Sequence, residues 1–214
     1  MTSTAYDKIV AYGKREFGIK IAYKNESLLM RILGYALFFN PAFMTKFITV
    51  IGTTVYFPSR KWLTTRRYSA AHILCHELVH VADERRVGAL AFRLSYLFPQ
   101  WLALFALSSF FIGPIGLLFL IFLAPLPAPF RTFWELRGYA MTDAALWQSN
   151  QRFTDLDRLT KQFTSGAYYF MWPFRNHIMS EVNSNRKLIQ KNALFEKIPE
   201  SSEILENLSN KDNK

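Results

Sequence analysis

The feature that most constrains the fold is a long stretch without charge. Residues 94–130 contain no charged side chain, and two runs within them, 101–112 and 115–124, are almost wholly apolar. Gly113-Pro114 separates the runs, and such a pair interrupts a helix. Together the runs could cross a bilayer, which takes roughly 20 residues, whereas each run alone suits one arm of a hairpin. We expect contact with membrane lipid, the alternatives being the core of a soluble α domain or a partner protein.

Composition narrows the class of protein further. The chain has 214 residues, half of them apolar, which is enough for one domain with a substantial core. Its formal net charge of +10 favours an anionic partner, either nucleic acid or lipid headgroups. The basic residues are scattered and form no known nucleic-acid motif, so we expect no specific nucleic acid partner. A single cysteine, Cys75, excludes a disulfide-framed secreted scaffold.

The polarity pattern predicts a mostly helical α+β domain over residues 1–198, with the hydrophobic hairpin inserted at 94–130. A small antiparallel sheet is expected beside the central helix, and residues 199–214 are expected to be a disordered tail. No secretory signal peptide is recognisable, so we expect the protein on the cytoplasmic side of a membrane, or in the cytoplasm with the hairpin buried. The expected strands are 19–24, 47–51 and 53–57, and the expected helices are 4–17, 28–39, 68–90, 131–147, 155–163 and 174–195.

The segment His76-Glu77-Leu78-Val79-His80 is an H-E-x-x-H motif within the expected helix 68–90. Two histidines four residues apart lie on one helix face, so both imidazoles can bind a single Zn²⁺. Glu77 can then act as the general base that takes a proton from the attacking water. The apolar neighbours of the motif indicate a buried helix, whereas incidental histidines on a surface helix would be the alternative. Strand 53–57 could be an edge strand that pairs with an extended peptide.

A catalytic zinc needs a third protein ligand. His72 cannot join the other two, because residues i, i+4 and i+8 of one helix span roughly 12 Å. Glu135 is the best candidate, because an acid between Trp134 and Leu136 needs a cation when it is buried. An ion pair or a helix-capping role is the alternative for Glu135, and His177 is the other candidate ligand.

The ligand assignment also constrains the charge-free stretch. Glu135 can meet His76 only if residues 94–130 go out and return, with Gly113-Pro114 as the turning point. Basic residues at both ends of the stretch fit a location of both ends on the cytoplasmic side. These basic residues are Arg85, Arg86, Arg93, Arg131 and Arg137.

With these residues the chain resembles the zincin metallopeptidases, and within them the gluzincin-like branch, whose third ligand is a glutamate on a later helix. The resemblance implies that His76, His80 and Glu135 bind Zn²⁺ and that Glu77 is the general base. The metzincin pattern places its third histidine where this chain has Arg86, which excludes that class. The segment Val55-Tyr56-Phe57-Pro58 is similar to a strand found in small phage and bacterial peptidases.

One departure from the branch bears on the supporting residues. Many gluzincins have an aspartate four residues after the ligand glutamate, where this chain has Tyr139. Asp83 could orient a ligand histidine, or could form an ion pair with Arg85 or Arg86. One of three phenols, Tyr139, Tyr168 or Tyr169, could donate to the oxyanion of the reaction, although each alone is more typical of a core.

The sequence therefore predicts a membrane-associated zinc peptidase that acts on a protein or peptide. The alternative is a non-catalytic basic protein that contacts a membrane or nucleic acid and has a structural metal site. Glu77 argues against that alternative, because a structural zinc site has no need of a general base.

Overall fold

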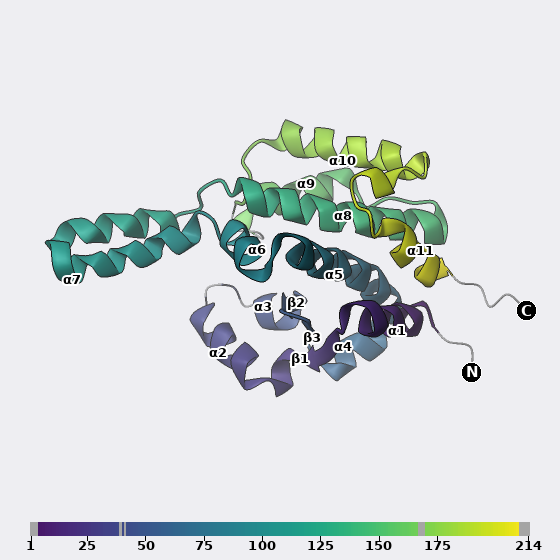
Figure 1. Cartoon of the computed structure of the whole chain (residues 1–214), viewed down its shortest axis with the longest axis horizontal. Helices are drawn as coiled ribbons and strands as arrows, with labels where there is room; N and C mark the ends of the chain where they lie inside the picture. Colours follow the sequence, from purple (N-terminus) through teal and green to yellow (C-terminus); the bar gives the residue numbers. More distant parts are fainter. Residues whose placement is uncertain (1–3, 39, 41, 167–169, 210–214) are drawn as a thin grey trace, which may run out of the picture.

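The computed structural model describes residues 4–38, 40, 42–166 and 170–209, and it is mostly helical with one small sheet (Figure 1). The first half of the described chain contains α1 (Ala5–Phe17), β1 (Lys20–Tyr23), α2 (Leu28–Ala36), α3 (Ala42–Thr45), β2 (Thr49–Ile51), β3 (Thr54–Phe57), α4 (Arg60–Thr65), α5 (Arg67–Val87) and α6 (Ala89–Tyr96). The second half contains α7 (Ser109–Ile112), α8 (Pro129–Asn150), α9 (Leu156–Thr164), α10 (Arg175–Gln190) and α11 (Ser201–Ser209). The predicted class, α+β and mostly α, is confirmed at this level.

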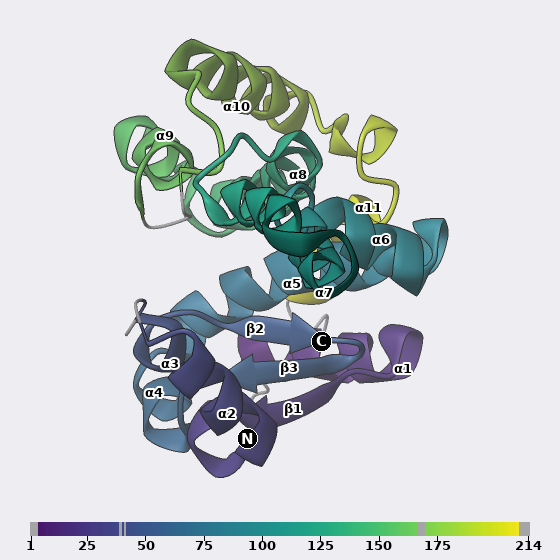
Figure 2. The same cartoon turned by 90° about the vertical axis from the view of Figure 1, so that its left-hand side faces the viewer.

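The sheet has the strand order β1-β3-β2, as the front of Figure 2 shows. Strands β2 and β3, which were expected at 47–51 and 53–57, pair antiparallel across Gly52, whose φ of 59° suits a tight turn. Strand β1 pairs with β3 in parallel, and the sheet is therefore mixed, so the prediction of an antiparallel sheet is wrong. The proposed edge strand at 53–57 is also wrong, because β3 is the central strand. A parallel partner was not predicted because its crossover connection leaves no turn signal.

Helix α5 is the central element of the molecule. The sheet and α1 lie on one side of it and α8 lies on the other (Figures 1 and 2). Helix α1 approaches closely at Gly13, where an added Cβ would lie 2.6 Å from Ile19 and 3.0 Å from Leu78. Both faces of α5 are thus covered, which explains why the residues around the H-E-x-x-H motif are apolar on all sides.

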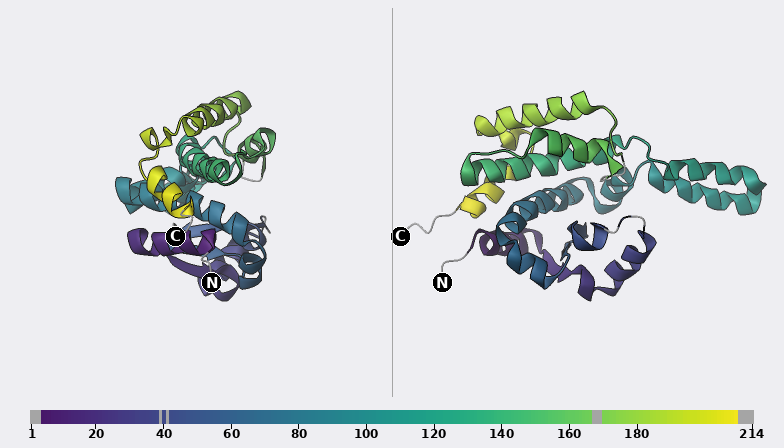
Figure 3. Two further views of the ribbon diagram at one scale, coloured as in Figure 1. Left: turned by 90° about the vertical axis from the view of Figure 1, so that its right-hand side faces the viewer. Right: turned by 180° about the vertical axis from the view of Figure 1, so that it is seen from behind.

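The charge-free stretch forms the predicted hairpin, which extends away from the other helices in Figure 1 and in the right-hand view of Figure 3. Its helical arms, Gln100–Ser108 and Gly113–Leu123, pack against each other, with the rings of Phe105 and Phe119 5.5 Å apart. Gly116 permits the close approach, because a Cβ there would overlap the backbone of Ser109. By length and composition Gln100–Leu123 could cross a membrane, and only 11% of its most apolar 18-residue stretch is buried inside the protein.

Two segments of the central and C-terminal regions differ from the predictions. The helix predicted at 68–90 ends at Val87, and Gly88, with φ of 90°, turns the chain into the separate helix α6. The predicted tail at 199–214 is wrong over its described part, because Ser201–Ser209 is helix α11. Ile204 and Leu208 of α11 are buried in the core with α1 and α8, so few but well-spaced apolar residues hold this helix in place.

The burial of α11 leads to a stability prediction. Ile204 is fully buried, so Ile204→Ala is expected to lower the free energy of unfolding by roughly 2–4 kcal/mol through lost burial and a residual cavity. The exposed Glu206 of the same helix is the matched control, and Glu206→Ala should change the free energy of unfolding by less than about 0.5 kcal/mol. Urea unfolding monitored by circular dichroism measures both. Equal midpoints for the two variants would contradict the packing of α11.

Candidate metal centre

His76 and His80 of α5 and Glu135 of α8 converge on one buried point. The Nε2 atoms of the two histidines lie 3.0 Å apart. The carboxylate of Glu135 lies 3.6 Å from Nε2 of His76 and 3.9 Å from Nε2 of His80. All three side chains are buried, and together they could hold a metal ion. Of the candidate third ligands, the structure brings Glu135 to the two histidines.

The spacing of these donor atoms fits a tetrahedral ion. Ligands about 2.0–2.1 Å from a zinc ion lie about 3.3 Å from one another, which falls within the range of the three distances. Oε2 of Glu135 is buried and has no hydrogen-bond partner among the described residues. A buried carboxylate oxygen without a donor is costly, and a cation between the three side chains would remove that cost.

The electrostatics favour the metal-binding forms of His80 and Glu135. Burial lowers the pKa of His76, but the carboxylates of Glu135 and Glu77 outweigh burial and raise it, so a metal competes with a proton at this imidazole. Burial and the neighbouring His76 lower the pKa of His80 to about 3, so its imidazole is neutral at pH 7. Burial opposes the charge of Glu135, but His76 and His80 outweigh it and lower the pKa of Glu135 to about 2. A neutral imidazole and an ionised carboxylate are the forms that ligate metals.

Gly138 makes room for the imidazole of His76. A Cβ at this position would lie 2.5 Å from Cε1 and 2.6 Å from Nε2 of His76. Gly138 lies one turn after Glu135. One face of α8 therefore carries Glu135 and also leaves space for the ring of His76. One further turn on, the hydroxyl of Thr142 lies 3.5 Å from Nδ1 of His76, on the side of the ring away from the other ligands. These two residues orient a ligand histidine, a role that the spacing of the motif alone does not reveal.

Glu77 is buried on the same helix, beside the ligands but outside the group of three. Burial raises the pKa of Glu77 to about 7. The negative charge of Glu77 acts on Lys24, a residue that the sequence did not mark as part of the site. Lys24 is fully buried directly after β1, and its Nζ donates to the carbonyl oxygen of Phe43 at 2.7 Å. Burial lowers the pKa of Lys24 to about 8, against the opposing effect of Glu77, so the general-base candidate has a buried cation in its surroundings.

Asp83 bonds to arginines. Its carboxylate accepts two hydrogen bonds from Arg137 of α8, at 2.7 and 2.8 Å, and one from Arg86 at 3.0 Å. Of the two roles considered for Asp83, the structure shows an ion pair, and its main partner is Arg137. The pair joins α5 to α8 beside the ligand candidates, because Asp83 is three residues after His80 and Arg137 is two residues after Glu135, so it supports the alignment of the two helices.

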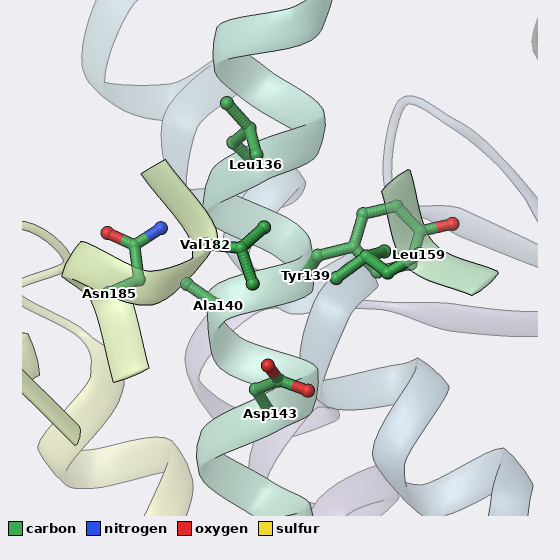
Figure 4. A pocket seen from close by; sticks show the side chains of 7 residues that line it. All are labelled: Leu136, Tyr139, Ala140, Asp143, Leu159, Val182 and Asn185. Carbon is green, nitrogen blue, oxygen red and sulfur yellow. The ribbon is translucent and has the colours of Figure 1, made fainter. Parts of the chain in front are cut away.

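Two tyrosines lie against the ligands. The ring of Tyr139 is edge-on to His76, with centroids 4.9 Å apart. Tyr139 also lines a shallow hollow between α8, α9 and α10 (Figure 4), which is too narrow to admit even a water molecule and therefore is not a ligand pocket. The hydroxyl of Tyr96, on α6, donates to Oε1 of Glu135. Tyr96 was missed because its position depends on the turn at Gly88. The oxyanion role of Tyr139 stays a prediction, and Tyr168 and Tyr169 lie outside the described residues.

The remaining candidates lie elsewhere. His72 is buried, and its ring nitrogens bond to the carbonyl oxygen of Tyr68 and the hydroxyl of Ser149. His177 is exposed on α10 beside Trp172. Burial raises the pKa of the Cys75 thiol to about 12, so this residue is a protonated core side chain.

The fit of Gly138 to His76 leads to a prediction. Gly138→Ala should displace the His76 imidazole and weaken zinc binding by roughly ten-fold or more. Gly166→Ala is the matched control, because a Cβ there meets only Phe170 at ordinary contact distance, 3.7 Å. Competition with a chromogenic chelator measures the zinc affinity of each folded variant. Wild-type affinity in Gly138→Ala would show that the close approach of α8 to His76 does not shape the metal centre.

Comparisons of the chain with protein-family models, with curated proteins and with solved structures give no match. The observations that bear on function are therefore the donor set, the buried acid beside it and the exposed apolar hairpin.

Proposed function

We propose that the protein is a zinc-dependent peptidase that acts at a membrane. The observation that carries the proposal is the convergence of His76, His80 and Glu135, with Glu77 buried on the same helix. Two imidazoles and one carboxylate are a donor set of catalytic zinc sites, which keep a fourth position for water. The bound metal would lower the pKa of that water and polarise the scissile carbonyl.

The residues of the chain have separate roles in this proposal. Glu77 takes a proton from the attacking water and passes it to the leaving amine. Its pKa near 7 suits both transfers at neutral pH, since the group must accept a proton and then release it. Tyr96 and Gly138 hold Glu135 and His76 in place, and Tyr139 is the candidate donor to the oxyanion.

Membrane association rests on the hairpin. Its tip residues Phe110 and Phe111 are 83% and 91% exposed, and similar side chains continue along both arms. Monomeric proteins in water do not expose contiguous apolar surfaces of this extent without a partner. We assign a lipid bilayer to the hairpin, with both of its ends on the cytoplasmic side.

The basic non-catalytic protein is the competing function. Incubation of the purified protein with casein or a peptide library, with and without a chelator, separates the two. Cleavage that the chelator abolishes and zinc restores supports a peptidase. Stoichiometric zinc without cleavage supports a structural site, and stoichiometric iron would assign different chemistry to the same residues, since two histidines and one carboxylate also hold non-haem iron.

The third ligand is tested by its removal. Glu135→Ala is expected to lower zinc affinity by roughly ten-fold or more, whereas His72→Ala and His177→Ala should leave it unchanged. The two histidine variants are matched controls for loss of a potential donor, one buried and one exposed. Metal content after gel filtration, measured by mass spectrometry on folded samples, gives the answer. Equal zinc loss in His177→Ala would remove Glu135 from the ligand set.

The general base is tested by an isosteric change. Glu77→Gln should retain zinc but lower peptide hydrolysis by roughly 100-fold or more, because the amide cannot accept the proton. Glu84→Gln on the same helix serves as the control, since Glu84 pairs with Arg93 at 2.8 Å and lies outside the group of three ligands. Loss of zinc from Glu77→Gln would show that Glu77 ligates or supports the metal instead.

A further inference from the structure

Helix α2 is apolar on its exposed face. Leu28, Ile32 and Tyr35 follow the spacing of one helix face and are 70%, 56% and 77% exposed. Phe38, just after the helix, is 83% exposed. The opposite face is apolar too, with Met30 fully buried and Gly34 against Met44 of the α3 segment. A surface helix of a soluble protein has a polar outer face, so the outer face of α2 is built for an apolar environment.

The position of α2 indicates which environment this is. In Figure 2 the hairpin and α2 both lie toward the viewer, and Figures 1 and 3 place α2 at the end of the molecule from which the hairpin projects. Helices α1 and α11 are at the opposite end. Helix α2 is therefore at the level of the hairpin's base, where a membrane that holds the hairpin would have its surface.

The distribution of charge agrees with an anionic membrane. No acidic residue occurs between Glu26 and Glu77, a segment that contains α2, or between Glu84 and Glu135, which contains the hairpin. These two segments contain ten of the 26 basic residues and none of the 16 acids, so the rest of the chain has 16 of each sign. In sequence the net charge of +10 thus belongs to these two segments. In the structure four of their basic residues, Arg60, Arg67, Arg86 and Arg93, pair with acids outside the segments, and Arg31 of α2 is among the other six. Basic residues beside apolar side chains are the signature of helices that lie in anionic lipid headgroups.

We propose that α2 is a second membrane-binding element, which lies in the headgroup region of the same anionic leaflet that the hairpin enters. The inference rests on the membrane association in the proposed function and extends it. A hairpin alone leaves the protein free to rotate about the hairpin axis. A second contact removes that freedom and sets the depth of the metal centre, whose Glu135 is four residues, or about 6 Å along α8, beyond Arg131 at the end of the charge-free stretch.

Fluorescent labels test the placement in the full-length chain with Cys75→Ala. A solvent-sensitive fluorophore is attached at Ile32→Cys in α2, at Phe110→Cys in the hairpin, or at Ser202→Cys in α11, which is exposed at the far end. Vesicles contain phosphatidylcholine with phosphatidylglycerol and lipids with quenchers at known depths. The labels at 32 and 110 should shift to the blue and be quenched, at shallow and deep positions respectively, while the label at 202 stays in water.

The outcomes separate the two proposals. Quenching at 110 without quenching at 32 overturns the role of α2 and leaves the hairpin in the membrane. Absence of quenching at both positions overturns the membrane association itself. A blue shift at 32 that depends on protein concentration and occurs without vesicles would show that a second copy of the chain covers α2, and this also overturns the proposal.

A charge substitution gives an independent test that does not depend on labels. Ile32→Glu places an acid on the outer face of α2, where it disturbs no buried side chain, and should weaken binding to the phosphatidylglycerol vesicles by roughly ten-fold. Ser202→Glu changes the net charge equally at the far end and should bind like the wild type. Flotation measures binding, and circular dichroism confirms that both variants fold. Equal binding by the two variants would overturn the proposal.

Discussion

The contact between α5 and α8 is the interaction on which the rest of the structure depends. Both helices contribute side chains that could hold a metal ion, and they approach so closely that only glycine fits at position 138, opposite the His76 ring. The Asp83–Arg137 pair joins the same two helices beside this contact, since Arg137 directly precedes Gly138. Because buried pairs of this kind are specific in geometry rather than strongly stabilising, their main effect here is to fix the helix register. A shift of one residue in either helix would separate the three donors.

The hairpin follows from the same contact. The chain leaves α5 near Gly88 and must return to begin α8 beside it, so a single passage of residues 94–130 across a membrane is incompatible with the ligand distances. The turn at Gly113 and the close approach at Gly116 let the two arms pack against each other without a charged group between them. The metal centre and the apolar hairpin are thus two consequences of one helix pairing.

Much of the centre could be predicted from the sequence because its information is local or chemical. The four-residue spacing of His76 and His80 places them on one helix face, and an acid among apolar neighbours marks Glu135. Most helix positions follow from periodicity and capping residues such as Thr4, Ser27 and Asp155, whose side chains accept hydrogen bonds from the first turn.

The rest depends on tertiary contacts that leave no local pattern. The fit of Gly138 to His76, the burial of Lys24 and the bond from Tyr96 to Glu135 each join segments distant in sequence. The parallel pairing of β1 with β3 is of the same kind, and so is α11, whose polar composition resembles a disordered tail although Ile204 is in the core. The place of the hairpin between the ligands has one further consequence, for the order of synthesis. The two histidines leave the ribosome before the hairpin, and Glu135 leaves after it. The donor set is therefore incomplete until the hairpin has been made and has folded back, so the nascent chain cannot assemble the candidate metal centre ahead of the apolar hairpin.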